Sequence, residues 1–327
     1  MRSKASFFTF TMAKKNYLIN NLKKSNKHDG VTLVCTFSRI IFVKPFFLAF
    51  NNLKMPRMPV HLLIYDNTED EPLAQALLKK VKPLVPHFKS VRLYKSYLKG
   101  RGNIQGSGNE HFKRSKLFNI WRMWLRLRKM IHTPYMFVLE DDTIYPPHAF
   151  QRLLRLVMRN PRVGFATGIE TGRSAYPWLP VGLGVHRVKM RGLKIIERHS
   201  LSPNCRGIQE IDASGVYCFA ARTRAWLSGF QGYNPITLKV PFFGMDNVLT
   251  YNIKRHGWKL IADFSVWCSH LQATGGRIMA FSKLQANERK DVWLPSCNNY
   301  ATGIEVKRKN QRARKFQVKK PAPSWEI

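Results

Sequence analysis

Three adjacent carboxylates, Glu140, Asp141 and Asp142, are the part of this sequence whose residue types point most directly to chemistry. The five apolar residues Tyr135–Leu139 come directly before them, and their aromatic and β-branched members are typical of a short buried strand. Open α/β sheets bind ligands beyond the carboxyl ends of their strands, which is where these acids lie. A divalent cation surrounded by phosphate oxygens would offset their mutual repulsion. The pattern favours this site over a solvated acidic turn, because the chain has only 19 acidic residues against 55 basic ones.

Segments that predict strands alternate along the chain with segments that predict helices. Besides the strand before the acids, we expect strands at 31–36, 61–66, 217–221, 259–262 and 265–268. We expect helices at 72–81, 110–131, 147–158 and 247–256. This alternation predicts an α/β fold with one largely parallel sheet.

Basic residues dominate the sequence, which carries a formal net charge of +36. Charge of this size repels itself in the compact state, so it favours an anionic counterpart such as nucleic acid, an anionic membrane surface or a phosphate-rich substrate. A generally solvated basic surface is the alternative. The excess extends to both ends, because 1–28 is rich in lysine and 306–320 contains eight Lys and Arg residues and no acid. We expect a flexible basic arm at 1–28, one folded domain at 29–305 and a basic tail at 306–327.

The cysteine and hydropathy patterns argue against several classes of protein. The five cysteines are scattered and form no CxxC pair, so neither a zinc site nor a disulfide framework is indicated. The apolar stretches at 7–10 and 40–50 are too short for a signal peptide or a membrane span. We therefore expect a cytoplasmic protein without a transmembrane segment. Contact of its basic tails with an anionic membrane surface remains an open alternative.

Taken in order, four parts of the chain resemble the GT-A class of nucleotide-sugar-dependent glycosyltransferases, and within it the family-2-like group. They are Val31–Arg39 (opening strand), Ile64–Asn67 (end of the second strand), Leu139–Asp142 (the D-x-D segment), and Phe243–Asn247 with Gly257, Trp258 and His270 (the C-terminal half). The resemblance covers residues 31–270 or so. It implies a GT-A fold, which is a single Rossmann-like, mostly parallel mixed sheet flanked by helices. The nucleotide-sugar half would be about 29–145 and the acceptor half about 146–305.

The resemblance also implies roles for the matching residues. Asp246 would be the catalytic base, and Asp142 and His270 would be the metal ligands. The ion, Mn2+ or Mg2+, would act as a Lewis acid on the leaving diphosphate. The residues implied to contact the nucleotide-sugar are Thr36, Arg39, Asp66, Glu140 and Asp141. The chain departs from the family at Met245, where an acid often precedes the base, and at Glu140, which replaces the first Asp of D-x-D.

Ordinary structural roles remain open for several of these residues. His270 has the position of a strand-end histidine with a backbone partner, Asp246 could be an N-cap, and Asp66 could belong to a turn. Lys116 follows the glycine-rich segment 101–109, and it is expected either at the diphosphate or on a solvated helix face.

We expect a metal-dependent glycosyltransferase that moves a sugar from a nucleotide-sugar to a polyanionic acceptor. DNA that contains hydroxylated or hydroxymethylated pyrimidines is the acceptor that best accounts for the charge, and the enzyme would have to extrude the base to reach it. A cell-surface polysaccharide or lipid is the alternative acceptor. A third alternative is a nucleic-acid-binding protein without enzymatic activity.

Overall fold

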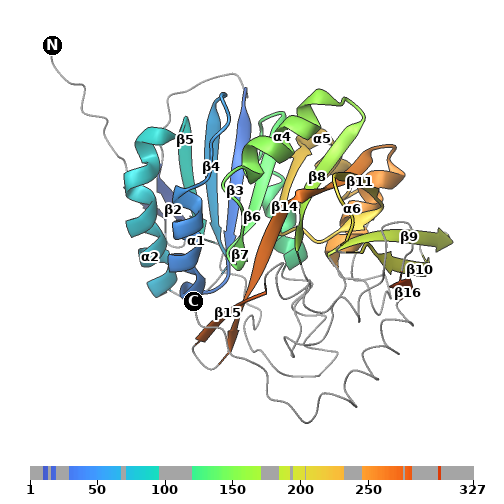
Figure 1. Ribbon diagram of the computed structural model, residues 1–327. Helices are drawn as coiled ribbons and strands as arrows, with labels where there is room; N and C mark the ends of the chain where they lie inside the picture. The colour runs from blue at the N-terminus through green and yellow to red at the C-terminus, as the bar shows by residue number, and fades with distance from the viewer. Residues whose placement is uncertain are drawn as a thin grey trace, which may run out of the picture.

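A mixed β-sheet forms the centre of the molecule (Figure 1). The computed structural model describes residues 10–13, 16–19, 29–67, 71–95, 120–170, 184–191, 194–202, 204–231, 245–274, 277–281 and 301–302. Eight strands follow one another across the sheet in the order β11 (Ile208–Ile211), β14 (Lys259–Thr274), β8 (Val163–Glu170), β13 (Cys218–Arg222), β6 (Tyr135–Glu140), β3 (Val31–Phe37), β4 (Val60–Asp66) and β5 (Ser90–Lys95). Two further strands, β7 (Thr143–Ile144) and β15 (Arg277–Phe281), pair with the far half of β14.

Six of these eight strands run in the same direction. The neighbours β5, β4, β3 and β6 are parallel, as are β8 and β14, whereas β13 and β11 are antiparallel to their neighbours. In the register of the sheet, Phe37 lies opposite Asp66, and Thr36 lies opposite Glu140. The carboxyl ends of β3, β4 and β6 therefore meet at one level of the same edge, as the sequence predicts for a ligand site.

Helices cover both faces of the sheet, because its central strands are apolar on both sides. All seven residues of β3 are buried, which is typical of a parallel strand between two helical layers. Leu33 faces one apolar cluster and Val34 faces the other. The first cluster includes α1 (Val43–Asn51), α2 (Glu71–Val81) and α4 (Ala149–Arg159), and the second includes α5 (Thr223–Ser228), α6 (Met245–Arg255) and the helical residues 120–127. Two short 3-10 helices, η1 (Ile40–Phe42) and η2 (Lys82–His87), adjoin α1 and α2.

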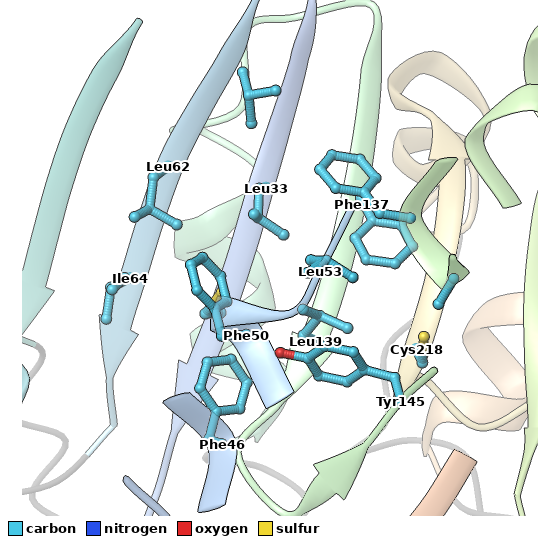
Figure 2. Packing of buried hydrophobic residues seen from close by; sticks show 14 of the residues in the cluster. Leu33, Phe46, Phe50, Leu53, Leu62, Ile64, Phe137, Leu139, Tyr145 and Cys218 are labelled. Carbon is cyan, nitrogen blue, oxygen red and sulfur yellow. The ribbon is translucent and has the colours of Figure 1, made fainter. Parts of the chain in front are cut away.

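Aromatic side chains of α1 fix the loop that follows β6. Figure 2 shows Phe46 and Phe50 packed over the strand that carries Leu33, with Tyr145 beside them. The rings of Phe46 and Phe50 stack with centroids 5.8 Å apart, and the ring of Phe46 meets that of Tyr145 edge-on at 6.0 Å. Burial of one such side chain contributes about 1.5–3 kcal/mol. Because Tyr145 directly follows β7, this packing also holds the short segment that begins at Asp142.

The central strand β8 is not predicted by its own sequence, VGFATGIE. All eight of its residues are buried. Its two glycines allow close packing: a Cβ on Gly164 would lie 2.7 Å from the Cβ of Ala225, and one on Gly168 would lie 2.7 Å from the carbonyl oxygen of Val266. Glycine is depleted in strands. The two glycines that let β8 fit between its neighbours therefore make its sequence look unlike that of a strand.

Most of the other expected elements are confirmed to within about two residues. The strands at 31–36, 61–66, 135–139 and 217–221 are β3, β4, β6 and β13, and the helices at 72–81, 147–158 and 247–256 are α2, α4 and α6. Of the helix expected at 110–131, residues 120–127 are helical and 110–119 lie outside the described residues. Residues 259–262 and 265–268 are strand residues as expected, but they belong to one 16-residue strand, β14, and not to two short strands.

A buried acid explains how β14 continues through that interval. Its pairing with β8 shifts register between Ala262 and Trp267. Within this interval the fully buried Asp263 accepts hydrogen bonds from the Nε of Arg152 at 2.5 Å and from the amide of Ser265 at 2.9 Å. The irregularity is therefore stabilised by side-chain hydrogen bonds, and the strand runs on to the far half that contains His270.

The remaining described segments lie outside this sheet. Within the expected basic arm at 1–28, β1 (Phe10–Ala13) and β2 (Asn16–Ile19) pair as antiparallel strands, so this part of the arm has regular structure. A second sheet consists of β12 (Ala213–Ser214), β9 (Val185–Arg191), β10 (Lys194–Ser200) and β16 (Ala301–Thr302). Among the described helices, none combines the length and the apolar character needed to span a bilayer. The expected tail at 306–327 lies outside the described residues.

We predict that Asp263→Ala lowers the free energy of unfolding by about 1–3 kcal/mol, because a buried carboxylate and its hydrogen bonds are lost at the irregularity of β14. Urea denaturation measures this loss. The matched control is Glu210→Ala on the neighbouring β11. Glu210 pairs with Lys254 and Lys259 on the surface, so its removal should cost less than about 1 kcal/mol. Equal losses in the two variants would contradict a special role for Asp263.

Candidate functional site

Five carboxylates lie at the edge where the parallel strands end. Asp66 ends β4, Glu140 ends β6 and precedes Asp141 and Asp142, and Glu170 ends β8. They belong to a chain with only 19 acidic residues. Like charges this close disfavour one another's ionised form, so nearby cations and N–H donors must offset their repulsion. Those partners define the site.

Asp142 and His270 meet because β7 pairs with β14. Thr143 lies opposite His270 in this antiparallel pair, and the amide of Leu271 donates to the carbonyl oxygen of Asp142 at 2.6 Å. The Oδ1 atom of Asp142 is 3.8 Å from the Nε2 atom of His270, and both residues are buried. The structure thus brings together the two residues that the family resemblance implies as metal ligands.

Arg39 holds the other oxygen of Asp142. Its Nη2 donates to Oδ2 of Asp142 at 3.0 Å, and its guanidinium lies 4.2 Å from the ring centroid of Phe42. A charge-assisted hydrogen bond of this kind fixes the carboxylate group with Oδ1 on the side of His270. Arg39 therefore lies within the site and positions Asp142. Its expected contact with a nucleotide-sugar stays a prediction.

Asp141 turns toward the end of β3. Its Oδ2 accepts hydrogen bonds from the amides of Ser38 at 2.7 Å and Arg39 at 3.0 Å, and its own amide donates to the carbonyl oxygen of Thr36 at 3.0 Å. Burial and, second, the charge of Asp142 raise the pKa of Asp141 to about 7, although the two amide hydrogen bonds act in the opposite direction. These bonds join the loops after β3 and β6. Contact of Asp141 or Thr36 with a nucleotide-sugar stays a prediction.

Glu170 is a site residue that sequence reasoning missed. Its Oε1 lies 3.2 Å from Nδ1 of His270, and its Oε2 accepts a hydrogen bond from Oγ1 of Thr143 at 3.3 Å. Its exposed fraction is 4%. The available signal was an acid at the end of the stretch VGFATGI, but the glycines concealed that this stretch is a strand.

Asp66 is fully buried beside a lysine that sequence reasoning also missed. Nζ of Lys95, at the end of β5, is 3.4 Å from Oδ2 of Asp66 and 3.6 Å from Oε2 of Glu71. Breaking a buried pair of this kind is costly, because it leaves an uncompensated charge. The amide of Asn67 donates to the carbonyl oxygen of Phe37 at 2.9 Å, which continues the pairing of β4 with β3 by one residue beyond Asp66. Contact of Asp66 with a nucleotide base stays a prediction.

Asp246 lies in the first turn of α6. The helix includes Met245, so Asp246 is inside it and is not the N-cap. Oγ1 of Thr250 donates to the carbonyl oxygen of Asp246 at 2.9 Å and accepts from the amide of Ser214 at 2.9 Å, which joins α6 to β12. The first turn of a helix favours negative charge. The catalytic role of Asp246 stays a prediction.

Two expected contact residues remain. Glu140 is half-buried at the end of β6, and its amide donates to the carbonyl oxygen of Tyr217 at 3.0 Å. Lys116 lies outside the described residues. Contacts of these two residues with a nucleotide-sugar stay predictions.

Asp142 and His270 fit a shared divalent ion as two of its ligands. Ligands that each lie about 2.1 Å from one ion are about 3.0 Å apart at right angles and about 4.2 Å apart when opposite. The 3.8 Å between Oδ1 of Asp142 and Nε2 of His270 lies between these two values, so a small shift of either side chain would bring both atoms onto one ion. Among the described residues, no group of three or more His, Cys, Asp and Glu side chains has the arrangement needed to hold an ion. An ion held by this pair would take its other ligands from phosphate and water.

Comparison with solved structures assigns the fold. The crystal structure of GalNAc-T7 with UDP, GalNAc and Mn2+ matches with a TM-score of 0.50 and 10% sequence identity, over 92% of this chain and 53% of that chain. This chain thus spans about half the length of that GalNAc-T7 chain, and the likeness shows that its fold is GT-A-like. The crystal structure of A197 from STIV matches over 79% of this chain and 92% of the A197 chain, with 12% sequence identity and a TM-score of 0.37. We draw no conclusion from a likeness this weak. No protein-family model and no curated protein sequence matches the chain.

The raised pKa of Asp141 predicts a pH-dependent effect of Asp141→Asn on the metal-free protein. An acid whose pKa is higher in the folded state contributes stability at low pH that is lost as the pH rises toward the folded value of about 7. The amide of Asn cannot ionise, so the variant should gain melting temperature relative to the parent between about pH 4 and pH 7. The difference should level off above pH 7. Thermal denaturation in EDTA at stepped pH measures it, and a constant difference would contradict the prediction.

Proposed function

We propose that this protein is a nucleotide-sugar-dependent glycosyltransferase that uses a divalent metal ion. One observation carries the proposal: Asp142 and His270, two residues with metal-binding side chains, lie 3.8 Å apart at the carboxyl edge of a GT-A-like sheet. The GalNAc-T7 structure with a similar fold contains UDP, GalNAc and Mn2+. A site that combines imidazole with carboxylate suits manganese somewhat better than magnesium. We therefore propose Mn2+ as the ion.

In this proposal Asp142 and His270 hold the ion, and the diphosphate of the donor completes its coordination. The bound ion would offset the charge that develops on the diphosphate as the sugar leaves. Arg39 fixes Asp142, and Asp141 joins the loops on either side of the site. These contacts preorganise the ligands before the donor binds, which is how enzymes stabilise a developing charge with little rearrangement.

Asp246 is the proposed general base. It would take the proton from the acceptor hydroxyl as that oxygen attacks the sugar carbon and the diphosphate departs. Proton transfer to a positioned base typically contributes about 10²–10⁴-fold to the rate. The support is the place of Asp246 in the first turn of α6, where negative charge is favoured, and the anchoring of that helix through Thr250 and Ser214.

The remaining donor contacts follow from the ends of β3, β4 and β6. We propose that Asp66, with Lys95 beside it, faces the nucleotide base. Thr36, Arg39, Glu140 and Asp141 would line the path from the base to the diphosphate, and Lys116 would meet the phosphates. The support is that the described members of this set lie within two residues of the carboxyl ends of neighbouring strands at one edge of the sheet.

DNA with hydroxylated or hydroxymethylated pyrimidines is the proposed acceptor, in the cytoplasm. The support is the net charge of +36, which suits a duplex that must be gripped through its phosphates while a base is extruded. A cell-surface polysaccharide or lipid, with the basic regions on an anionic membrane, is the alternative acceptor. A nucleic-acid-binding protein without activity is the other alternative. The Asp142–His270 pair argues against it, because binding nucleic acid requires no metal ligands.

We predict that Asp142→Asn and Asp246→Asn separate donor binding from sugar transfer. Asp142→Asn should lose both Mn2+-dependent binding of the donor and sugar transfer, because a metal ligand is weakened. Asp246→Asn should bind the donor normally and lose transfer by about 10²–10⁴-fold, because a general base acts on the acceptor and not on the diphosphate. Calorimetric titration of nucleotide-sugars with and without Mn2+, together with turnover, measures both effects.

Circular dichroism and melting temperature serve as the controls for folding in both variants. Full activity of a folded Asp142→Asn protein would contradict the metal site. Full activity of Asp246→Asn would contradict the base and leave Asp246 with a structural role in α6.

We also predict that the protein attaches a sugar to hydroxymethylated duplex DNA. The duplex is incubated with a panel of nucleotide-sugars and Mn2+, digested to nucleosides and analysed by mass spectrometry. The expected result is a nucleoside heavier by one hexose or pentose with at least one donor, and no adduct with Asp142→Asn. Binding alone does not test this prediction, because a protein of this charge binds DNA through its phosphates in any case. Transfer to a glycan or lipid instead, with no adduct on DNA, would contradict the proposed acceptor.

A further inference from the structure

Glu170 occupies a position from which it can control the metal-ligand candidate His270. We infer that Glu170 is a positioning residue that accepts the Nδ1 proton of His270 and thereby presents the Nε2 lone pair toward Asp142. The metal-directed part of this inference rests on the proposed function. The part that concerns the histidine ring rests on the described residues alone.

The geometry places the two oxygens of Glu170 on the two segments that carry the ligand pair. Oε1 is 3.2 Å from Nδ1 of His270, which belongs to β14. Oε2 accepts a hydrogen bond at 3.3 Å from Oγ1 of Thr143, which directly follows Asp142 and lies opposite His270 in the pairing of β7 with β14. One carboxylate therefore contacts both segments, so it fixes the distance between them as well as the ring.

Oε1 of Glu170 and Nδ1 of His270 lie at ion-pair distance without hydrogen-bond geometry in this structure, and the chemistry of the two groups determines the direction in which they can bond. An ionised carboxylate can only accept, so a hydrogen bond between Glu170 and Nδ1 of His270 requires a proton on Nδ1. In a neutral ring Nε2 is then the unprotonated nitrogen, and Nε2 is the atom that lies 3.8 Å from Oδ1 of Asp142. A carboxylate that orients a histidine in this way also raises the basicity of the metal-binding nitrogen. Glu170 would thus give His270 the tautomer that a divalent ion requires.

Burial adds weight to this assignment. The exposed fraction of Glu170 is 4%, and a carboxylate out of contact with water is stable only when its oxygens are hydrogen-bonded or paired with charge. Thr143 supplies a hydrogen bond to one oxygen, and Nδ1 of His270 lies 3.2 Å from the other. Glu170 would be equally buried if it only stabilised the fold. The test therefore needs a measured property that a change in stability alone would leave unaltered.

The first measurement is the tautomer of His270 in the metal-free protein, observed by 15N NMR of the imidazole nitrogens. The His270 signals are identified by their loss in His270→Gln. We expect a single Nδ1-protonated tautomer in the parent and a mixture in Glu170→Ala. This readout needs no metal, and the parent result needs no Glu170 variant to fold. A parent ring protonated mainly on Nε2, or an unchanged ring in folded Glu170→Ala, would overturn the assignment.

The second measurement is Mn2+ affinity, determined by electron paramagnetic resonance with UDP or GDP present. Loss of a residue that orients a metal ligand typically weakens binding by about 10–100-fold, which we expect for Glu170→Ala. Glu170→Gln keeps an accepting oxygen and most of the volume, so its loss should be smaller. The matched control is Glu197→Gln, because the half-exposed Glu197 lies 3.5 Å from His199 in β10, far from the proposed ligands in the sequence. Its Mn2+ affinity should equal that of the parent.

The two measurements separate the inference from the proposed function. A parent protein that binds no Mn2+ with either nucleotide overturns the proposed function, and the tautomer measurement still decides the role of Glu170. A parent that binds Mn2+ while both folded Glu170 variants bind it equally well overturns the positioning role and leaves the proposed function in place.

Discussion

Antiparallel pairing between the two residues of β7 and the far half of β14 holds the loop after β6 against a strand that the chain forms much later. Through this contact Asp142 and His270 become neighbours, and Thr143 and Glu170 gain their partners. The contact depends in turn on two features of the core. Aromatic packing of α1 against Tyr145 fixes the segment after β7, and the hydrogen bonds of Asp263 let β14 continue past its shift in register.

Electrostatics explains why the acids at this edge tolerate one another. Three of the five have a cationic or N–H partner: Arg39 for Asp142, the Ser38 and Arg39 amides for Asp141, and Lys95 for Asp66. These partners offset much of the repulsion, but the raised pKa of Asp141 shows that burial and the neighbouring charge still outweigh its two amide hydrogen bonds. A divalent ion at Asp142 would lower that residual cost, so the edge suits binding of a cation together with phosphate.

The sequence predicts the strands whose residue types are typical of strands. It misses a strand whose residue types are determined by close packing against its neighbours. β3, β4 and β6 consist mostly of apolar, β-branched and aromatic residues, so their ends and the acids on them can be located without a structure. β8 cannot, because Gly164 and Gly168 are there to admit neighbouring atoms. The roles of Glu170 and Lys95 were missed for a related reason: each is defined by a partner on another strand, His270 and Asp66, and periodicity along the chain carries no information about that pairing.

In the proposed site Asp142 and His270 share one divalent ion. The most direct test is anomalous diffraction at the manganese edge from crystals grown with Mn2+ and a nucleoside diphosphate. The expected result is one strong peak within about 2.3 Å of both Oδ1 of Asp142 and Nε2 of His270, with phosphate oxygens completing the coordination. A bound nucleotide with the manganese peak elsewhere, or with none, would contradict it.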